Sequence, residues 1–330
     1  MPMSPITRRT LLTALGGLGG AALTGCTARH AAPPPTDPAA AVGPPTAGPL
    51  PSVTVATATG PVTVPGAPMR VVVLDTAELD SALTLGITPV GAARAAADPA
   101  LPDYWPASRL APMAYVGPIG APDLAAVRAL RPDLILSNQA RDGGRYDDLR
   151  AIAPTVLTAT TGAPWKANLQ THAEALGRQD AAAAFAASYQ RHVNQVATAL
   201  ANARVGGRRV SLVRFVEGGG IRLHGRQNFP GSVLADAGVP RPDSQNVDQS
   251  DLELPPDQLA RADGDLLLYA GYGDPARNGL TATLASPGWQ ALEAVRAHRA
   301  FPVDDQLWFQ GIGFTGANFL LDELQRFLGA

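Results

Sequence analysis

Arg70-Val-Val-Val-Leu-Asp75 is an unbroken run of apolar residues between two charged ends. Such a run predicts a strand that is buried on both faces, as in a parallel sheet covered by helices. A helix is predicted over residues 78–85 and a short strand over residues 89–92. Farther along, a helix that begins at the capping residue Asp123 leads into a second buried strand, residues 134–137. Strands that alternate with helices predict a parallel α/β sheet.

The second half of the chain repeats this plan. Residues 209–215, Arg-Val-Ser-Leu-Val-Arg-Phe, predict another central strand, and residues 256–269 repeat the helix, acidic turn and strand of residues 123–137. The stretch 180–203 between them contains neither Gly nor Pro. Its larger apolar residues follow one face of a long helix: Phe185, Tyr189, Val193, Val196 and Leu200. We therefore predict two parallel-sheet α/β lobes bridged by one long α-helix, with a ligand cleft at the carboxyl ends of the strands.

The first 26 residues have the organisation of an export signal. Arg8-Arg9 precedes an apolar run, residues 11–23, that is too short to span a bilayer, and Leu23-Thr24-Gly25-Cys26 follows. The arginine pair resembles a twin-arginine signal, and Leu-Thr-Gly-Cys resembles a bacterial lipobox, in which the cysteine is acylated. We expect a protein anchored to the outer face of the cell membrane through a lipidated Cys26.

These patterns divide the chain into six segments. A Pro-rich stretch follows Cys26 and predicts a semi-rigid tether, and alternating residues around Gly60 predict a hairpin. The predicted segments are an export signal (1–25), the lipidated cysteine and tether (26–51), an N-terminal hairpin (52–69), an N-lobe (70–178), a bridging helix (179–204) and a C-lobe (205–330).

Composition and motifs exclude several classes of function. The 26 basic and 28 acidic residues give a net charge of −2, which does not indicate nucleic-acid binding. One cysteine and five scattered histidines do not predict a metal site built from side chains. Residues 311–316 match a dinucleotide-binding pattern, but they lack the βαβ unit and the acidic residue that the pattern requires. No nucleophile with a nearby base is recognisable, so we do not expect an enzyme.

Taken in order, several short motifs resemble those of the cobalamin and iron-siderophore solute-binding proteins of ABC importers. They span about residues 69–329 and include the strand 70–75, Val116-Gly117, Leu130-Arg-Pro-Asp-Leu-Ile-Leu136, Ala175-Leu-Gly177, residues 232–238, residues 289–295 and Trp308. The resemblance implies the class III architecture and a receptor that delivers its solute to a permease. Family members often dock through a glutamate on each lobe; the matching segments here carry Asp123 and Asp236 instead.

Polar and aromatic residues at the predicted strand ends are the candidate ligand-binding residues. They are Arg94, Tyr115, Asn138, Arg141, Trp165, Arg214, Arg226, Tyr269, Tyr272 and Trp308. Arginine forks bind carboxylate-like oxygens in pairs, and aromatic faces suit planar chelate rings. A ferric chelate is often anionic because its hard oxygens together outweigh the charge of Fe³⁺.

The sequence therefore predicts a monomeric receptor for a ferric siderophore or a ferric citrate-like chelate, with no cofactor of its own. Iron would be held by the chelator; whether a side chain also coordinates it is left open. A haem or cobalamin receptor of the same fold and a lipoprotein without a transport role remain as alternatives. Haem would require an axial Tyr or His in the cleft.

Overall fold

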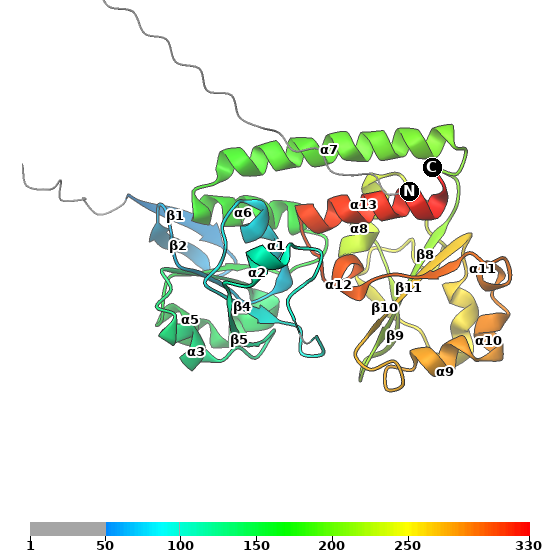
Figure 1. Cartoon of the computed structure of the whole chain (residues 1–330), viewed down its shortest axis with the longest axis horizontal. Helices are drawn as coiled ribbons and strands as arrows, with labels where there is room; N and C mark the ends of the chain where they lie inside the picture. The colour runs from blue at the N-terminus through cyan, green and yellow to red at the C-terminus, as the bar shows by residue number, and fades with distance from the viewer. Residues whose placement is uncertain (1–50, 99) are drawn as a thin grey trace, which may run out of the picture. The chain divides into compact units, whose positions relative to one another are not determined.

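The buried run at the start of the first lobe forms β3 (Val71–Val73), the central strand of a five-stranded sheet (Figure 1). The computed structural model describes residues 51–98 and 100–330. The strand order is β5-β4-β3-β6-β7, and every neighbouring pair is parallel. The other strands are β4 (Gly91–Arg94), β5 (Ala114–Pro118), β6 (Leu134–Asn138) and β7 (Thr155–Thr158).

Helices cover both faces of this sheet, which is why all of β3 is buried. Val71 and Val73 pack with residues of α1 (Thr76–Thr84) and α6 (Trp165–Leu176). Val72 packs on the opposite face with α3 (Leu124–Ala129) and α5 (Tyr146–Arg150). Three short elements lie in the connections: α2 (Ala107–Leu110), α4 (Gln139–Asp142) and a 3₁₀ turn, Gly143–Arg145. The predicted hairpin consists of β1 (Ser52–Thr57) and β2 (Gly60–Pro65).

The second lobe contains a sheet of mixed direction, with strand order β10-β9-β8-β11-β12. Its strands are β8 (Val210–Val216), β9 (Gly220–His224), β10 (Asp251–Glu253), β11 (Leu266–Tyr272) and β12 (Ala300–Pro302). β8, β11 and β12 are parallel, as predicted, whereas β9 is antiparallel to both of its neighbours, β8 and β10. The reversal at β9 follows from its connection, because three residues join β8 to β9, too few for a crossover. Gly218 and Gly220 both have φ of 72°, which suits this tight turn.

The remaining helices of the second lobe are short. They are α8 (Phe229–Asp236), α9 (Leu280–Leu284), α10 (Pro287–Gln290), α11 (Glu293–Arg296) and α12 (Asp305–Trp308). A 3₁₀ segment, Pro256–Ala262, stands where the sequence predicts a helix before β11.

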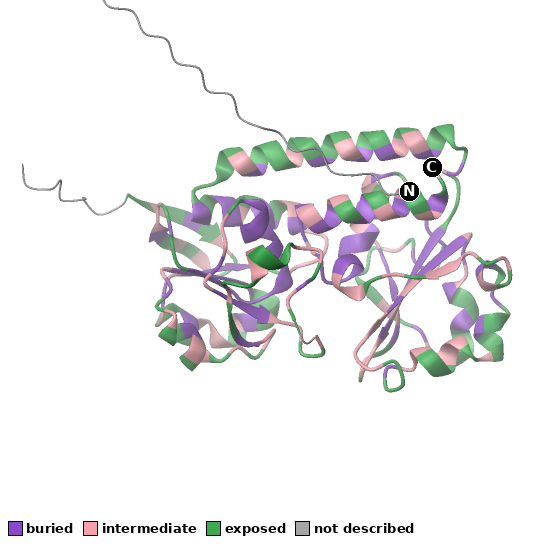
Figure 2. Cartoon of the chain, viewed as in Figure 1, coloured by how far each residue is buried: buried purple, intermediate pink, exposed green. Residues whose placement is uncertain are grey.

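The long helix α7 (Gln179–Asn202) has 24 residues and links the two lobes (Figure 1). One stripe of it is buried: Ala182, Tyr189, Val193, Val196 and Leu200 (Figure 2). Phe185, predicted to share this stripe, is 39% exposed. The buried face passes through Ala182 and Ala186, so Phe185 lies one residue, or about 100°, away from it. Among the helices of the described ranges, none is both long and apolar enough to cross a bilayer.

The last helix, α13 (Phe314–Leu328), packs along α7 and also contacts α1 of the first lobe and α8 of the second. The predicted architecture of two α/β lobes linked by a long helix is thus confirmed. At the start of α13, the buried Asp80 of α1 accepts hydrogen bonds from the backbone N–H groups of Thr315 (3.3 Å) and Gly316 (3.1 Å). The hydroxyl groups of Thr84 and Tyr104 donate to the same carboxylate. Asp80 therefore joins the two lobes.

Replacing Asp80 by Ala should lower the free energy of unfolding by about 1–3 kcal/mol, because buried N–H donors of α13 lose their acceptor. Asp80→Asn, which keeps one acceptor oxygen, should cost less. Urea denaturation of each variant measures the effect. Asp123→Ala, which removes the exposed cap of α3, is the control and should cost about 1 kcal/mol. An Asp80→Ala loss smaller than that of Asp123→Ala, or no larger than that of Asp80→Asn, would contradict this account.

Candidate ligand-binding cleft

A cavity of about 260 Å³ lies between the two lobes at the carboxyl ends of the parallel strands. The first lobe lines it with residues that follow β3, β4, β5 and β6, and the second lobe with residues of β8 and β11 and of the segment after α12. The lining residues are Asp75, Thr76, Ala95, Ala96, Ile119 and Arg141 on one side and Arg214, Val216, Tyr272, Phe309, Gln310 and Ile312 on the other. This is the position at which open α/β sheets bind ligands.

A second cavity of about 190 Å³ continues from the first and shares Arg141, Arg214, Phe309 and Ile312 with it. Its other lining residues include Thr160, Arg222, His224 and Asn228. His224 is buried, and its Nδ1 lies 2.8 Å from Oδ1 of Asp251. We refer to the two cavities together as the cleft.

On the first lobe, the cleft presents Arg141 together with Asp75. Arg141 Nε donates to Asp75 Oδ2 over 3.2 Å, and half of the Arg141 side chain is exposed. Asp75 is held from behind: its Oδ1 accepts from the backbone N–H of Thr76, and its Oδ2 accepts from the amide of Asn138. The arginine is therefore oriented by a fixed carboxylate.

On the second lobe, Arg214 forms a bidentate pair with Asp305 over 2.6 and 2.7 Å. Its guanidinium also lies 5.1 Å from the ring centroid of Tyr272 and 5.3 Å from that of Phe309. Only 19% of the Arg214 side chain is exposed. Two arginines from opposite lobes thus face one cavity, and each is paired with an aspartate.

Contacts between the lobes also border the cleft. The backbone N–H of Ala97 donates to the Tyr272 hydroxyl, and the Gln310 amide donates to both Asp98 and Asp305 over 2.8 Å. Burial raises the pKa of Asp98, and the neighbouring Asp305 adds to this shift. The segment after β4 therefore reaches the second lobe at the edge of the cavity.

Three of the ligand-binding candidates predicted from the sequence lie in the cleft: Arg141, Arg214 and Tyr272. Three others are buried inside the protein. Asn138 supports Asp75, Trp308 donates from Nε1 to Glu323, and Trp165 is 2% exposed. The prediction is corrected for these three, because side chains enclosed by other residues do not line a cavity.

Trp165 belongs to an aromatic cluster where α6, α7, α8 and α13 meet. Its ring packs edge-on against Tyr189, Phe229 and Phe314, with centroid distances of 4.7–5.6 Å. Its Nε1 donates to Ser232 of the second lobe. Trp165 therefore holds the lobes together.

The other candidates lie outside the residues that line the cleft. Arg94 is the last residue of β4, and its guanidinium stacks 4.1 Å from the ring centroid of Tyr115. Tyr115 is half exposed. Arg226 binds Asp248 and Asn246. Tyr269 packs on Trp289 in the core of the second lobe. Strand ends carry side chains toward both faces of a sheet, so position along the sequence did not separate these residues from Arg141 and Arg214.

The two predicted docking acids both have partners within the protein. Asp123 is exposed and caps α3 by accepting from Ala125 N and Ala126 N. Asp236 accepts from the Tyr189 hydroxyl (2.7 Å) and pairs with Lys166 (2.5 Å).

Sequence reasoning missed Asp75, Phe309 and Gln310, which line the cleft, and Asp305, which pairs with Arg214. Asp75 was visible as the polar end of the first buried strand, and Asp305 follows the short strand β12. Asp75 is the first acidic residue after β3, and Asp305 is the second acidic residue after β12. An acidic residue just after a predicted strand is the signal that could have found them. Within the described ranges, no three His, Cys, Asp or Glu side chains gather in a metal-binding arrangement.

Two α/β lobes joined by a long helix, with arginines from both lobes in one cleft, define a solute-binding protein. Residues 71–307 match the model of the family described as periplasmic binding protein, and the chain belongs to that family. The resemblance inferred from the sequence motifs is thereby confirmed. The predicted export signal and Cys26 lie outside the described residues.

Similar proteins carry names that concern iron uptake. The chain is 31% identical to the probable siderophore-binding lipoprotein YfiY of Bacillus subtilis, over 80% of this chain and 83% of that protein. It is 29% identical to the Fe(3+) dicitrate-binding periplasmic protein FecB of Escherichia coli, over 78% and 84%. Staphylococcus aureus SirA, solved in complex with staphyloferrin B, superposes with a TM-score of 0.74 and 26% identity, over 84% of this chain and 98% of SirA.

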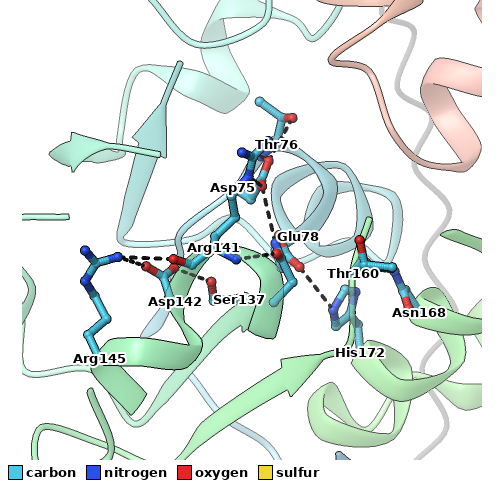
Figure 3. A network of polar contacts seen from close by, with 11 residues as sticks. Asp75, Thr76, Glu78, Ser137, Arg141, Asp142, Arg145, Thr160, Asn168 and His172 are labelled. Carbon is cyan, nitrogen blue, oxygen red and sulfur yellow. Dashed lines mark hydrogen bonds and ion pairs between the residues drawn. The ribbon is translucent and has the colours of Figure 1, made fainter. Parts of the chain in front are cut away.

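Behind the cleft, His172 of α6 is fully buried beside Glu78 of α1 (Figure 3). Burial lowers the pKa of His172 to about 4. The folded protein therefore keeps a neutral imidazole over a range in which the unfolded chain takes up a proton.

Stability should consequently fall as the pH is lowered from about 6.5 to about 4, by about 1.4 kcal/mol per pH unit from this group. His172→Gln should remove this slope, measured as the difference between variant and parent in urea unfolding at each pH. Burial raises the pKa of Asp80 to about 6, so Asp80 makes the protein more stable as the pH falls. Parent and variant share this contribution, and it cancels when their free energies of unfolding are subtracted. Parallel stability profiles for parent and variant would refute the prediction.

Proposed function

We propose that this protein is an extracytoplasmic receptor that captures a ferric siderophore or a ferric citrate-like chelate and delivers it to an ABC importer permease. The observation that carries the proposal is the pair of arginines, Arg141 and Arg214, which face one cavity from opposite lobes. Guanidinium groups bind carboxylate, catecholate and hydroxamate oxygens through paired hydrogen bonds. The names of the similar proteins support the same class of solute.

The cleft suits a chelate that arrives with its iron already bound. Hard oxygens of the chelator saturate Fe³⁺, and the described part of the cleft offers no cluster of metal-ligating side chains. Tyr272 and Phe309 supply flat faces beside Arg214, which suit planar chelate rings. The iron is cargo in this proposal, and the protein has no cofactor.

A thermal-shift screen with ferric citrate, ferric staphyloferrin B, a ferric hydroxamate, hemin and cobalamin tests the proposal. A bound solute at about 100 times its Kd stabilises the protein by about 2.7 kcal/mol. We expect a ferric chelate to raise the melting temperature. A response to hemin alone, with a Soret band, or to cobalamin alone would replace the proposed solute. No response to any of them would favour a lipoprotein without a transport role.

Arg141→Ala and Arg214→Ala should each weaken binding of that ferric chelate by about 10- to 150-fold, or about 1.5–3 kcal/mol, measured by isothermal titration calorimetry. Each change removes a charged donor and leaves Asp75 or Asp305 without its counter-charge. Lysine should rescue only partly, since it replaces a planar fork by a point charge. Arg226→Ala is the matched control outside the cleft and should change affinity less than about twofold. If both cleft variants also stay within twofold, arginine does not carry binding.

We further propose that the receptor acts as a monomer and docks on its permease through an acidic residue on each lobe, with Asp123 and Asp236 as the candidates. Asp123 is exposed at the start of α3, which suits a contact with a partner. Asp236 would have to exchange its pair with Lys166 for a cation of the permease. Docking at this site would therefore disturb the contact between α6 and α8.

The proposed location is the outer face of the cell membrane, with Cys26 as the lipidated first residue of the mature protein. The motivation is the order of Arg8-Arg9, the apolar run 11–23, Leu23-Thr24-Gly25-Cys26 and the Pro-rich stretch. Cys26→Ala should release the protein from the membrane fraction, as judged by immunoblotting. Mass spectrometry of the native N-terminal peptide should find an acylated Cys26, and a free thiol at this position would refute the assignment.

A further inference from the structure

Three buried carboxyl groups lie together behind Arg141, and two arginines of the described part of the chain pair with them (Figure 3). Asp75 binds Arg141 over 3.2 Å. Asp142 of α4 binds Arg145 over 2.6 Å and also accepts from the Ser137 hydroxyl. The third carboxyl group belongs to Glu78, one turn after Asp75 on α1, and no arginine pairs with it in the described structure.

No cation of the described residues balances a negative charge on Glu78. Its side chain is 0% exposed, and neither carboxyl oxygen makes a hydrogen bond of ordinary geometry within the described ranges. The facing groups are Asp75, Asp142, the amide of Asn138 and, from α6, His172, whose Nε2 lies 3.9 Å from Glu78 Oε1. His172 does not supply the missing charge, because its own burial keeps the imidazole neutral.

These surroundings favour the protonated acid. Burial and the charge of Asp75 raise the pKa of Glu78 to about 8, and the Glu78 backbone N–H and the Asn138 amide offset only part of this shift. With Glu78 protonated, the charges behind the cleft are those of two ion pairs, Asp75 with Arg141 and Asp142 with Arg145. Loss of the Glu78 proton would add a third carboxylate with no partner.

We propose that Glu78 is a positioning residue of the cleft, whose protonated carboxyl group keeps Asp75 and Arg141 matched and so permits an anionic chelate to bind. This inference rests on the proposed function. Ionised Glu78 adds a negative charge next to Asp75, which competes with the solute for Arg141 and repels an anion. By reciprocity, a bound anionic chelate makes Glu78 hold its proton more tightly.

The affinity of the parent protein for an anionic chelate should therefore weaken between pH 7 and pH 9. Since the pKa of Glu78 is about 8, the loss should reach up to about tenfold at pH 9. Glu78→Gln, which has the same shape and stays neutral, should bind as the parent does at pH 7 and keep its affinity at pH 9. Ferric citrate and ferric staphyloferrin B are the probes, measured by isothermal titration calorimetry.

Dividing the Kd of the parent by the Kd of Glu78→Gln at each pH removes the pH dependence of the chelate itself. Glu174→Gln is the matched control: Glu174 is an exposed acid on α6, and its variant should follow the parent at every pH. Infrared spectroscopy of the parent without solute gives a second measurement. A protonated carboxyl band present at pH 7, lost at pH 9 and absent from Glu78→Gln is expected.

The outcomes separate this inference from the proposed function. A parent that binds a probe at pH 7 but shares its pH profile with Glu78→Gln refutes the role of Glu78 alone. Absence of the carboxyl band at pH 7 refutes it as well, because Glu78 would then be ionised at that pH. A parent that binds neither probe at pH 7 refutes the proposed function for these chelates, and this role of Glu78 falls with it.

Discussion

The buried carboxylate of Asp80 determines how the two lobes meet. It lies on α1 of the first lobe and accepts N–H groups at the start of α13, where the helix has unpaired donors and a partial positive charge. Gly313 is required at this point, since a Cβ there would overlap the Asp80 carboxyl group. The hydroxyls of Thr84 and Thr315 add a contact at 2.8 Å. With the lobes fixed along α13 and α7, the cleft is left on the side of the strand ends.

Paired arginines give the cleft a different electrostatic character from a simple basic pocket. Arg141 and Arg214 each have an aspartate behind them, so the cavity offers directed donors with little excess charge. A solute then gains most binding free energy where its oxygens match the guanidinium N–H groups that the aspartates leave free. Binding therefore depends more on the geometry of these hydrogen bonds than on long-range electrostatic attraction. Selectivity among chelates of similar charge follows from this arrangement.

Much of the fold was predictable because burial leaves a clear mark on a sequence. The strands at Val71–Val73 and Leu134–Asn138 and the long helix were predicted in place and type. The antiparallel direction of β9 was not predicted, because it is determined by the short Gly-rich turn between β8 and β9. For the site, strand ends pointed to Arg141, Arg214 and Tyr272, which line the cavity, but equally to Trp308, which is buried. Only packing between distant segments distinguishes a side chain that lines a cavity from one that fills the core.

Lys166 is the only lysine in the sequence, and it lies between the rings of Trp165 and Tyr189 and the carboxylate of Asp236. Amine-directed chemistry therefore has a single side-chain target in this protein, located where both lobes and the long helix meet. A fluorophore or a spin label coupled there would report on this junction without any engineered residue. Cleavage by a lysine-specific protease would likewise be confined to one peptide bond, the one that follows Lys166 at the start of α6.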